Sequence, residues 1–391
     1  MKKNNNSLLI LILTVGVFGI INTEMGIIGI LPSLAGHYDV SVSQAGLLVS
    51  LFALAVAISG PTMPILFSGI NRKTVMMLVL GIFVISNIVS IFTTNFTISL
   101  IARVIPAFFH PVYCALALST ASSSVAPEEA PKAVSRVVMG VSAGMIFGLP
   151  VTSFIANSGS LELALSFFAI VNILALLATI LFVPSMPVKE KTSYGSQISI
   201  LKYGITWLAI LAVICLNSAI FGVYSYFSEY MESVTNITGQ MVTGMLFIFG
   251  FASIIGNILA GKLLSSKKNI RAILFYPFAL GITYLLLFLF GELTIPTAII
   301  VLLFGMLMGI GNNICQYWIT SAAPKAPDFA NGLFLAFGNL GTTIGTSVGG
   351  LFIASMGTRY VVISAWIFLL LAAVFIALRV FKYHSRNAAT N

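Results

Sequence analysis

Two charged residues, one acidic and one basic, stand inside long apolar segments of this sequence. Glu24 follows Asn22 and Thr23 within the apolar stretch 8–31, and Arg103 lies within the stretch 97–122. A charge at the centre of a bilayer costs about 2.5–3.5 kcal/mol or more, so such residues usually mark transport pathways or proton relays. A carboxylate whose hydration and neighbouring charges change with conformation binds protons differently in the two states. We therefore expect proton coupling; the alternative is a static ion pair tying two helices together.

A histidine lies on the same predicted helix as Arg103. His110 follows Arg103 by seven residues, which places both on roughly one helical face. It stands between Pro106 and Pro111, which should bend the helix. Because histidine changes its charge near neutral pH, His110 could carry protons or bind substrate. The alternative is a hydrogen-bonded packing residue at a kink.

Amide and aromatic side chains within the apolar stretches suit a solute site. Uncharged donors and acceptors match a neutral polar solute, and aromatic rings can line its pocket. The alternatives are hydrogen bonds between helices and an aromatic belt at the membrane surface. The candidate solute-binding residues are Asn22, Asn217, Tyr224, Asn312, Asn313, Gln316 and Asn339.

Composition indicates the elements that must position these side chains. Hydrophobic residues make up 59% of the 391 residues and charged residues only 7%. A membrane-spanning helix needs roughly 20 apolar residues, so the chain has room for twelve spans and no sizeable soluble domain. We predict an all-α integral membrane protein with helices near 8–31, 44–68, 75–93, 97–122, 134–156, 162–183, 204–228, 239–263, 271–290, 295–320, 329–354 and 359–381.

The basic residues support this topology. With a cytoplasmic N-terminus, every Lys and Arg except Arg103 and Arg359 falls on the cytoplasmic side, as the positive-inside rule requires. Both termini are then cytoplasmic. The net charge of +9 comes from short basic clusters rather than a continuous stripe, so we expect no nucleic-acid partner. The three cysteines lie in apolar segments and predict small core residues, not a disulfide framework or metal site.

The chain divides into two related halves. Residues 184–203 form a charged, turn-rich linker between predicted six-helix bundles at 1–183 and 204–391. Pro127, Gly144 and Gly148 recur as Pro324, Gly341 and Gly345, each 197 residues later. Two repeated bundles are typical of transporters, with the substrate site near the membrane midplane between them.

Glycines repeat at four-residue spacing in both halves. They are Gly140, Gly144 and Gly148, followed by Pro150, and in the second half Gly341, Gly345 and Gly349. This spacing predicts close helix packing, and the seam could be one about which the halves rock. No metal-protease, phosphate-loop, dinucleotide or serine-hydrolase motif accompanies it, so we expect no enzyme.

Three segments carry a resemblance to a known family: TEMGIIGILPSLAGHYDVSVSQAGLLVSLFALAVAISGP at 23–61, ARVIPAFFHP at 102–111 and GVSAGMIFGLP at 140–150. They resemble the major facilitator superfamily, specifically its twelve-span drug:proton antiporters, which include bacterial arabinose-type, sugar and purine efflux permeases, and the third segment resembles the antiporter motif of that family. The resemblance implies two pseudo-symmetric six-helix bundles in the cytoplasmic (inner) membrane of a bacterium. It also places Glu24 on the family's acidic position and Arg103 on its arginine.

Two positions depart from the family pattern. The loop motif appears as SGINRK at 68–73, with Ser68 where the family has an aspartate, although the gating pair Arg72 and Lys73 is present. Pro111 replaces a typical glycine. These departures put the charge-relay gating and the local bend in question.

Together these features predict proton-coupled export of a small organic solute, such as a drug, sugar or nucleoside-like molecule, by alternating access. The proton gradient would supply the energy, without metal or organic cofactor, and we expect the chain to act as a monomer. The alternatives are a uniporter or importer of a neutral solute, and a non-transporting membrane sensor on a transporter fold.

Overall fold

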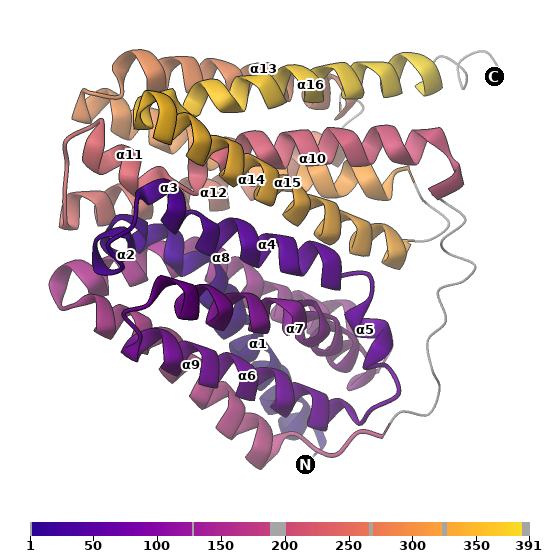
Figure 1. Ribbon diagram of the computed structural model, residues 1–391. Helices are drawn as coiled ribbons and strands as arrows, with labels where there is room; N and C mark the ends of the chain where they lie inside the picture. The colour runs from indigo at the N-terminus through magenta and orange to yellow at the C-terminus, as the bar shows by residue number, and fades with distance from the viewer. Residues whose placement is uncertain (1, 127–128, 188–200, 266–268, 323–326, 385–391) are drawn as a thin grey trace. The chain divides into compact units, whose positions relative to one another are not determined.

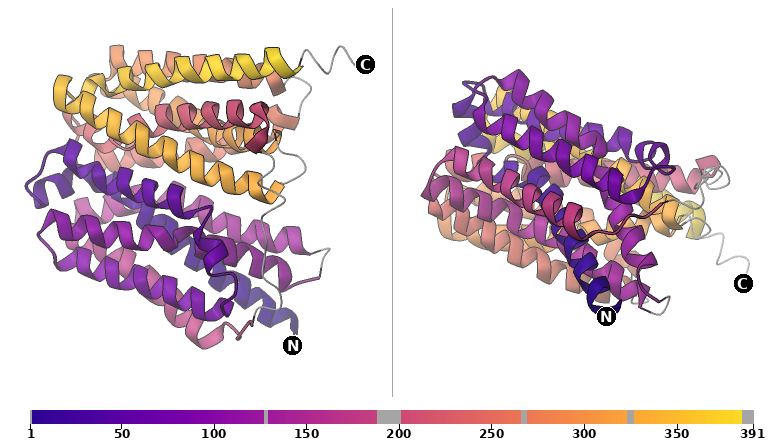
Figure 2. Two further views of the ribbon diagram at one scale, coloured as in Figure 1. Left: turned by 45° about the vertical axis from the view of Figure 1, so that its right-hand side comes forward. Right: turned by 90° about the horizontal axis from the view of Figure 1, so that it is seen from below.

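A computed structural model of the chain describes residues 2–126, 129–187, 201–265, 269–322 and 327–384 (Figure 1). Within these ranges every regular element is a helix, which Figure 2 shows from two further sides. In a bilayer the backbone cannot hydrogen-bond to water, and a helix satisfies its donors and acceptors internally. The all-α prediction is therefore confirmed.

In the first half, the first two predicted spans are each divided into several elements. The remaining four spans are single helices. The elements are α1 (Lys2–Gly26), the 3₁₀ helix η1 (Ile27–Ile30), α2 (Leu31–His37), α3 (Val42–Ala45), α4 (Leu47–Ser59), α5 (Met63–Leu66), α6 (Arg72–Phe92), α7 (Phe96–Ser123), α8 (Ala130–Ser158) and α9 (Leu161–Phe182).

In the second half, only the first span is divided into two α-helices. The elements are α10 (Gly204–Tyr224), α11 (Phe227–Ser233), α12 (Gln240–Ser265), α13 (Asn269–Phe290), α14 (Thr294–Thr320), α15 (Pro327–Met356), the 3₁₀ helix η3 (Thr358–Tyr360), α16 (Val361–Arg379) and the π-helical η4 (Val380–His384).

The predicted spans all correspond to helical stretches. Eleven stretches in the described residues are long and apolar enough to cross a membrane, and α15, with 30 residues, lies where the remaining span was predicted. The single helix predicted at 44–68 was wrong, because this segment forms α3, α4 and α5. Gly60 and Pro61 separate α4 from α5, since a proline disfavours helical backbone in the residue before it.

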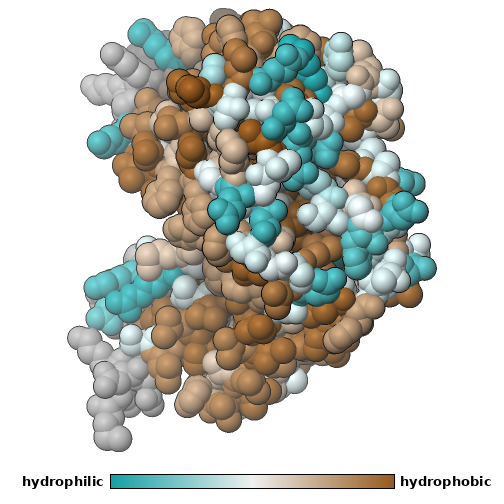
Figure 3. All heavy atoms as spheres, turned by 90° about the vertical axis from the view of Figure 1, so that its left-hand side faces the viewer, coloured by the Kyte–Doolittle hydropathy of each residue, from teal (hydrophilic) through white to brown (hydrophobic). Residues whose placement is uncertain are grey.

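Large apolar side chains cover much of the surface. Phe92 is 81% exposed, Ile295 77% and Leu351 66%, and broad apolar areas appear on the face drawn in Figure 3. Such areas exceed what soluble monomers expose. Lipid is therefore the medium in which these helices pack.

The first span of each half breaks at an equivalent position. The 3₁₀ helix Ile27–Ile30 interrupts the first span, and Ser225 and Tyr226 separate α10 from α11. Adding the sequence offset of 197 to residues 27–30 gives 224–227, which contains this second break. The repeat read from glycines and prolines thus extends to backbone geometry.

The helices form two compact units. One comprises residues 1–41 and 58–192, and the other residues 42–57 and 193–391. Residues 42–57 belong to the second unit, where the Thr343 hydroxyl donates to the Ser50 carbonyl at 3.2 Å. Most of the predicted linker 184–203 lies outside the described residues, and the predicted bundle boundaries stay a prediction.

The glycine ridges join helices within each unit. A Cβ atom on Gly140 would lie 2.4 Å from the Thr14 carbonyl oxygen of α1, and one on Gly345 would lie 2.2 Å from the Ser218 carbonyl oxygen of α10. The prediction of close helix packing is confirmed. Each ridge packs α8 on α1 or α15 on α10, so its contacts lie inside a unit, and a gating role stays a prediction.

Candidate functional site

An acid and a histidine meet inside the first unit. The Glu24 Oε2 atom of α1 lies 3.4 Å from the His110 Nε2 atom of α7, and the two residues are 8% and 2% exposed. A protonated Nε2 can donate to the carboxylate, and an unprotonated Nε2 can accept from a carboxylic acid. One geometry therefore accommodates the proton on either group.

Arg103 contacts the backbone next to this pair. Its guanidinium donates to the Thr23 carbonyl at 3.2 Å and to the Glu24 carbonyl at 3.3 Å. Both carbonyls lie where α1 gives way to η1 and where intrahelical hydrogen bonding changes, and a cation stabilises such a helix end. The expected proximity of Glu24 and Arg103 is present, but their hydrogen bond uses the Glu24 carbonyl, whereas the carboxylate contacts His110.

Cys114 is a neighbour of this site that the sequence analysis did not select. Its Sγ atom lies 3.8 Å from His110 Nε2, one helical turn further along α7. The four-residue spacing of His110 and Cys114 is the signal that could have revealed this contact. The imidazole nitrogen thus lies close to both a carboxylate and a thiol.

A polar network around Thr23 holds the site in place. The Thr23 hydroxyl donates to the Gly19 carbonyl at 2.8 Å. It accepts hydrogen bonds from Asn172 of α9 at 3.0 Å and from Asn87 of α6 at 3.4 Å. Neither amide was among the candidate residues predicted from the sequence. The network joins α1, α6 and α9 one residue from Glu24.

Asn22 is placed in the interface between α1 and α8. It is fully buried, and its Oδ1 atom would lie 2.9 Å from a Cβ atom on Gly148. Neither amide atom has a hydrogen-bond partner among the described residues. Residues 22 and 24 are about 200° apart on a helix, so Asn22 and Glu24 occupy opposite faces.

Most candidate amides of the second unit already bond within it. Asn217 Nδ2 donates to the Val213 carbonyl at 3.0 Å, and Asn339 Nδ2 donates to the Leu335 carbonyl at 3.0 Å. Both of these bonds stay within one helix, whereas Asn217 Nδ2 also donates to Cys315 Sγ of α14 at 3.6 Å. They leave part of each amide available for another partner, since a primary amide carries two donors and an acceptor.

Two further amides on α14 bond to neighbouring helices. Asn313 donates to Asn257 Oδ1 of α12 at 2.7 Å, and Gln316 donates to Asn331 Oδ1 of α15 at 3.1 Å. These are the interhelical hydrogen bonds that the alternative interpretation expected. Asn312, also on α14, is half-buried and has no hydrogen bond to another described residue.

Tyr224 belongs to an aromatic cluster beside the break between α10 and α11. Its ring stacks on Phe249 with centroids 4.7 Å apart and packs edge-on against Phe221 at 5.8 Å and Phe304 at 6.5 Å. Tyr224 is 2% exposed. The cluster connects α10, α12 and α14.

The predicted gating pair anchors helix ends within the first unit. Arg72 donates to the Ser123 hydroxyl at the end of α7 at 3.2 Å, and Lys73 donates to the Ile180 carbonyl near the end of α9 at 2.8 Å. Cations are favourable at these carboxyl ends. Asn71, which the sequence analysis missed, caps α6 by accepting from the Lys73 amide at 3.0 Å.

Ligand clusters for a metal do not occur among the residues that the structure describes, where no group of three or more His, Cys, Asp or Glu side chains is suitably placed. The polar groups of the first unit instead converge on Glu24 and His110. Buried ionisable groups in a many-span helical protein mark substrate pathways and proton relays, as found in membrane transporters.

The chain belongs to the Major Facilitator Superfamily, whose family model matches residues 13–327. It is 30% identical over 364 residues to an uncharacterized MFS-type transporter, YtbD, from Bacillus subtilis, covering 92% of this chain and 91% of that protein. It is 25% identical to a probable sugar efflux transporter from Pasteurella multocida, covering 92% and 89%.

Solved structures share the fold. The nucleoside transporter NupG superposes with a TM-score of 0.76 at 14% identity, covering 97% of this chain and all of the other. A bacterial homolog of the lysosomal transporter Spinster, inward-facing and occupied, gives 0.74 at 16% identity, covering 97% of both chains. The prediction of a major facilitator fold is confirmed, and the chain is a multi-pass membrane transporter.

Proposed function

We propose that this transporter exports a small neutral polar solute in exchange for protons, by alternating access, across the inner membrane of a bacterium with both termini cytoplasmic. The observation that carries the proposal is the buried contact between Glu24 and His110. A carboxyl group kept from water beside a second proton-binding group is suited to take up and release a proton as its surroundings change.

Coupling requires that the Glu24 carboxylate binds its proton more weakly when it is open to water than when it is enclosed. When its side of the protein opens to water, Glu24 ionises and its proton leaves; when it is enclosed, the neutral acid is the less costly form. Arg103, held on the Thr23 and Glu24 carbonyls, fixes this part of α1 and supplies a nearby positive charge. The proton gradient is the energy source in this scheme, and no cofactor takes part.

The solute class rests on the second unit. Its amides on α14 and its aromatic cluster offer hydrogen bonds and flat apolar surfaces without a fixed charge. Relatives named as probable sugar efflux transporters are consistent with a neutral, hydrogen-bonding solute. Asn312 is the favoured contact because its amide makes no hydrogen bond within the described residues.

Purified protein in liposomes with an internal pH dye tests the proposal. Neutral sugars, nucleosides and cationic drugs are added singly, and proton movement is recorded with and without an imposed pH gradient. We expect at least one neutral polar solute to drive proton flux. Solute flux without proton flux would indicate a uniporter, and neither flux across the panel would favour a non-transporting sensor.

His110→Gln should change the pH profile of transport while leaving solute binding intact. Glutamine keeps a hydrogen-bonding group near Glu24 but cannot take up a proton, so we expect slower coupled transport with a displaced pH optimum. The measurement is transport rate between pH 5.5 and 8.5 alongside solute affinity. His37→Gln is the matched control, because half-buried His37 lies away from Glu24, next to the Thr93 carbonyl and edge-on to the Tyr38 ring. A pH profile identical in both variants would contradict the role of His110.

Asn312→Ala should weaken solute affinity about fivefold, since one hydrogen bond contributes roughly 1 kcal/mol. Asn313→Ala is the adjacent control, because Asn313 is already bonded to Asn257 and its loss should reduce stability more than affinity. Affinity is measured by equilibrium binding and stability by thermal unfolding. Unchanged affinity in Asn312→Ala would remove this residue from the solute site.

A further inference from the structure

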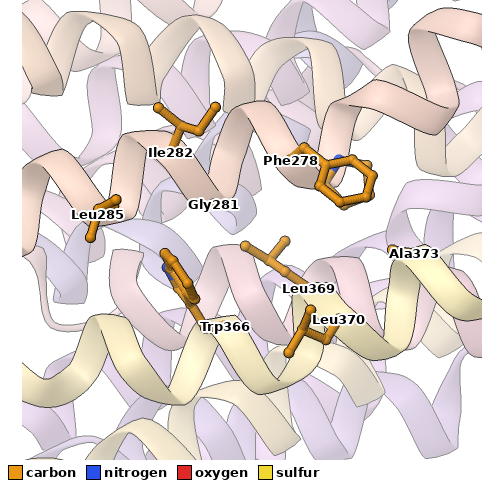
Figure 4. A pocket seen from close by; sticks show the side chains of 9 residues that line it. Phe278, Gly281, Ile282, Leu285, Trp366, Leu369, Leu370 and Ala373 are labelled. Atoms are coloured by element: carbon orange, nitrogen blue, oxygen red, sulfur yellow. The ribbon is translucent and has the colours of Figure 1, made fainter.

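An apolar groove runs between α13 and α16 of the second unit (Figure 4). Its volume is about 190 Å³, and its lining side chains expose no polar area. Phe278 is 57% exposed, Ile282 60% and Leu370 64%. The groove is therefore open at the surface of the unit, where lipid rather than water surrounds these helices.

Small residues create the groove. Gly281 has no side chain, and a Cβ atom there would lie 3.7 Å from a methyl group of Leu369. Pro277 and Ala373 are also small for an interface between long apolar helices. The larger side chains on either side form the walls, so a slender apolar chain can lie between them.

The two helices run in opposite directions along the groove. Figure 4 shows Leu285 opposite Trp366 at one end, and Phe278 near Leu370 and Ala373 at the other. The first residues of α13 and the last residues of α16 therefore lie at the same end of the groove.

That end carries positive charge. Arg271 lies on the same face of α13 as Phe278 and Ile282, because residues 271, 275, 278 and 282 follow helical spacing. It is exposed and has no ion-pair or hydrogen-bond partner among the described residues. Phe278 lies seven residues further along, about 10 Å, so Arg271 stands at the edge of the apolar region.

Arg271 is an exposed cation at this end of the groove, and no acidic residue stands near it in the sequence of either helix end. Residues 262–271 and 373–384 contain no Asp or Glu. Arg379, at the same end, is buried against Trp318 and donates to the Trp318 carbonyl and the Ser321 hydroxyl. At the opposite end Arg359 pairs with Glu292 at 2.6 Å. Among the described arginines, Arg271 is the exposed one that is in register with the groove and has no ion-pair partner.

We propose that this groove binds an acyl chain of an anionic phospholipid whose phosphate pairs with Arg271. The apolar lining accepts the chain, and the arginine accepts the headgroup at the membrane surface, where each basic residue contributes about 1 kcal/mol toward anionic lipid. The site is independent of the proposed proton coupling and solute.

Tryptophan quenching by brominated lipid tests the site, because Trp366 lines the groove. Trp207→Phe and Trp318→Phe leave Trp366 as the only tryptophan. The protein is placed in vesicles of equal phosphatidylcholine and phosphatidylglycerol, with bromine on the chains of one lipid or the other. Surface charge is then the same in both samples. We expect the anionic lipid to occupy the groove about fivefold in preference, which corresponds to ~1 kcal/mol.

Three variants distinguish a specific site from general attraction. Arg271→Gln should remove the preference, whereas Lys262→Gln, which removes an exposed charge on α12, should retain it. Gly281→Leu should fill the groove and reduce quenching by both lipids. Trp318 packs on Arg379, so replacing it could disturb this end of the groove. The series is therefore repeated with Trp318 retained, and because this residue is only 2% exposed, the brominated lipids should quench it little. Equal quenching by both lipids, or a preference that survives Arg271→Gln, would overturn the proposal.

Discussion

Glu24→Gln is expected to abolish proton-driven transport while the protein stays folded and still exchanges solute for solute. Glutamine preserves the size of the side chain and a hydrogen bond to His110 Nε2, but it cannot ionise. Glu24 is 8% exposed and its carboxylate contacts His110 at 3.4 Å, so the change removes a titratable group without opening a cavity. Solute-driven proton flux in liposomes and solute counterflow are the two measurements.

Glu162→Gln is the matched control for this substitution, because Glu162 is an exposed acid in the first turn of α9. It should transport as the parent protein does. Uphill solute movement that persists in Glu24→Gln would rule out this residue as the proton carrier. Loss of counterflow together with coupling would instead indicate a structural role, that of the static pair.

Gly345→Ala is expected to destabilise the second unit by about 1–3 kcal/mol, the usual cost of forcing atoms into a packed interface. The added Cβ atom would lie 2.2 Å from the Ser218 carbonyl oxygen and 2.7 Å from its Cα atom. Because both are backbone atoms, only separation of α10 from α15 can relieve the clash. The loss of stability is measured by thermal unfolding. Unfolding is detected through the labelling of Cys215 and Cys315, which are buried in the folded protein.

Gly244→Ala provides the comparison. Gly244 lies within α12, and a Cβ atom there meets nothing within 4 Å, so the higher helix propensity of alanine should maintain or raise stability. Equal unfolding temperatures for the two variants would show that the α10–α15 contact is not as tight as the structure indicates.

Apolar run lengths were sufficient to predict the span positions, because a bilayer requires uninterrupted helices of a set length. They could not predict where spans break. The break at Ile27–Ile30 lies in a segment as apolar as its surroundings, and the break at Ser225–Tyr226 contains no glycine or proline. Only the break at Gly60–Pro61 contains residue types that predict it. Composition reports burial in lipid, whereas local backbone geometry depends on packing partners.

For the candidate site, sequence reasoning selected Glu24, Arg103 and His110 by their rarity within spans. It could not predict which partner each would choose. Reach along the helices allowed Glu24 to pair with Arg103, yet the guanidinium contacts carbonyls and His110 contacts the carboxylate. The directions in which the side chains point in the folded protein decide which groups contact Arg103 and which contact the Glu24 carboxylate. Asn87 and Asn172 could not be predicted as part of the site for the same reason. Both donate to the Thr23 hydroxyl, and nothing in the sequence distinguishes this hydroxyl from the others within the spans.

The first span of each half breaks at an equivalent position, yet the two breaks carry different side chains. At the offset of 197 residues, Glu24 corresponds to Phe221, which packs against Tyr224. One copy of the broken helix therefore presents an acid near carbonyls that Arg103 contacts, and the other presents aromatic rings. After duplication, a shared irregularity in the backbone can be kept while its side chains diverge, so a single inherited bend offers two different functional surfaces.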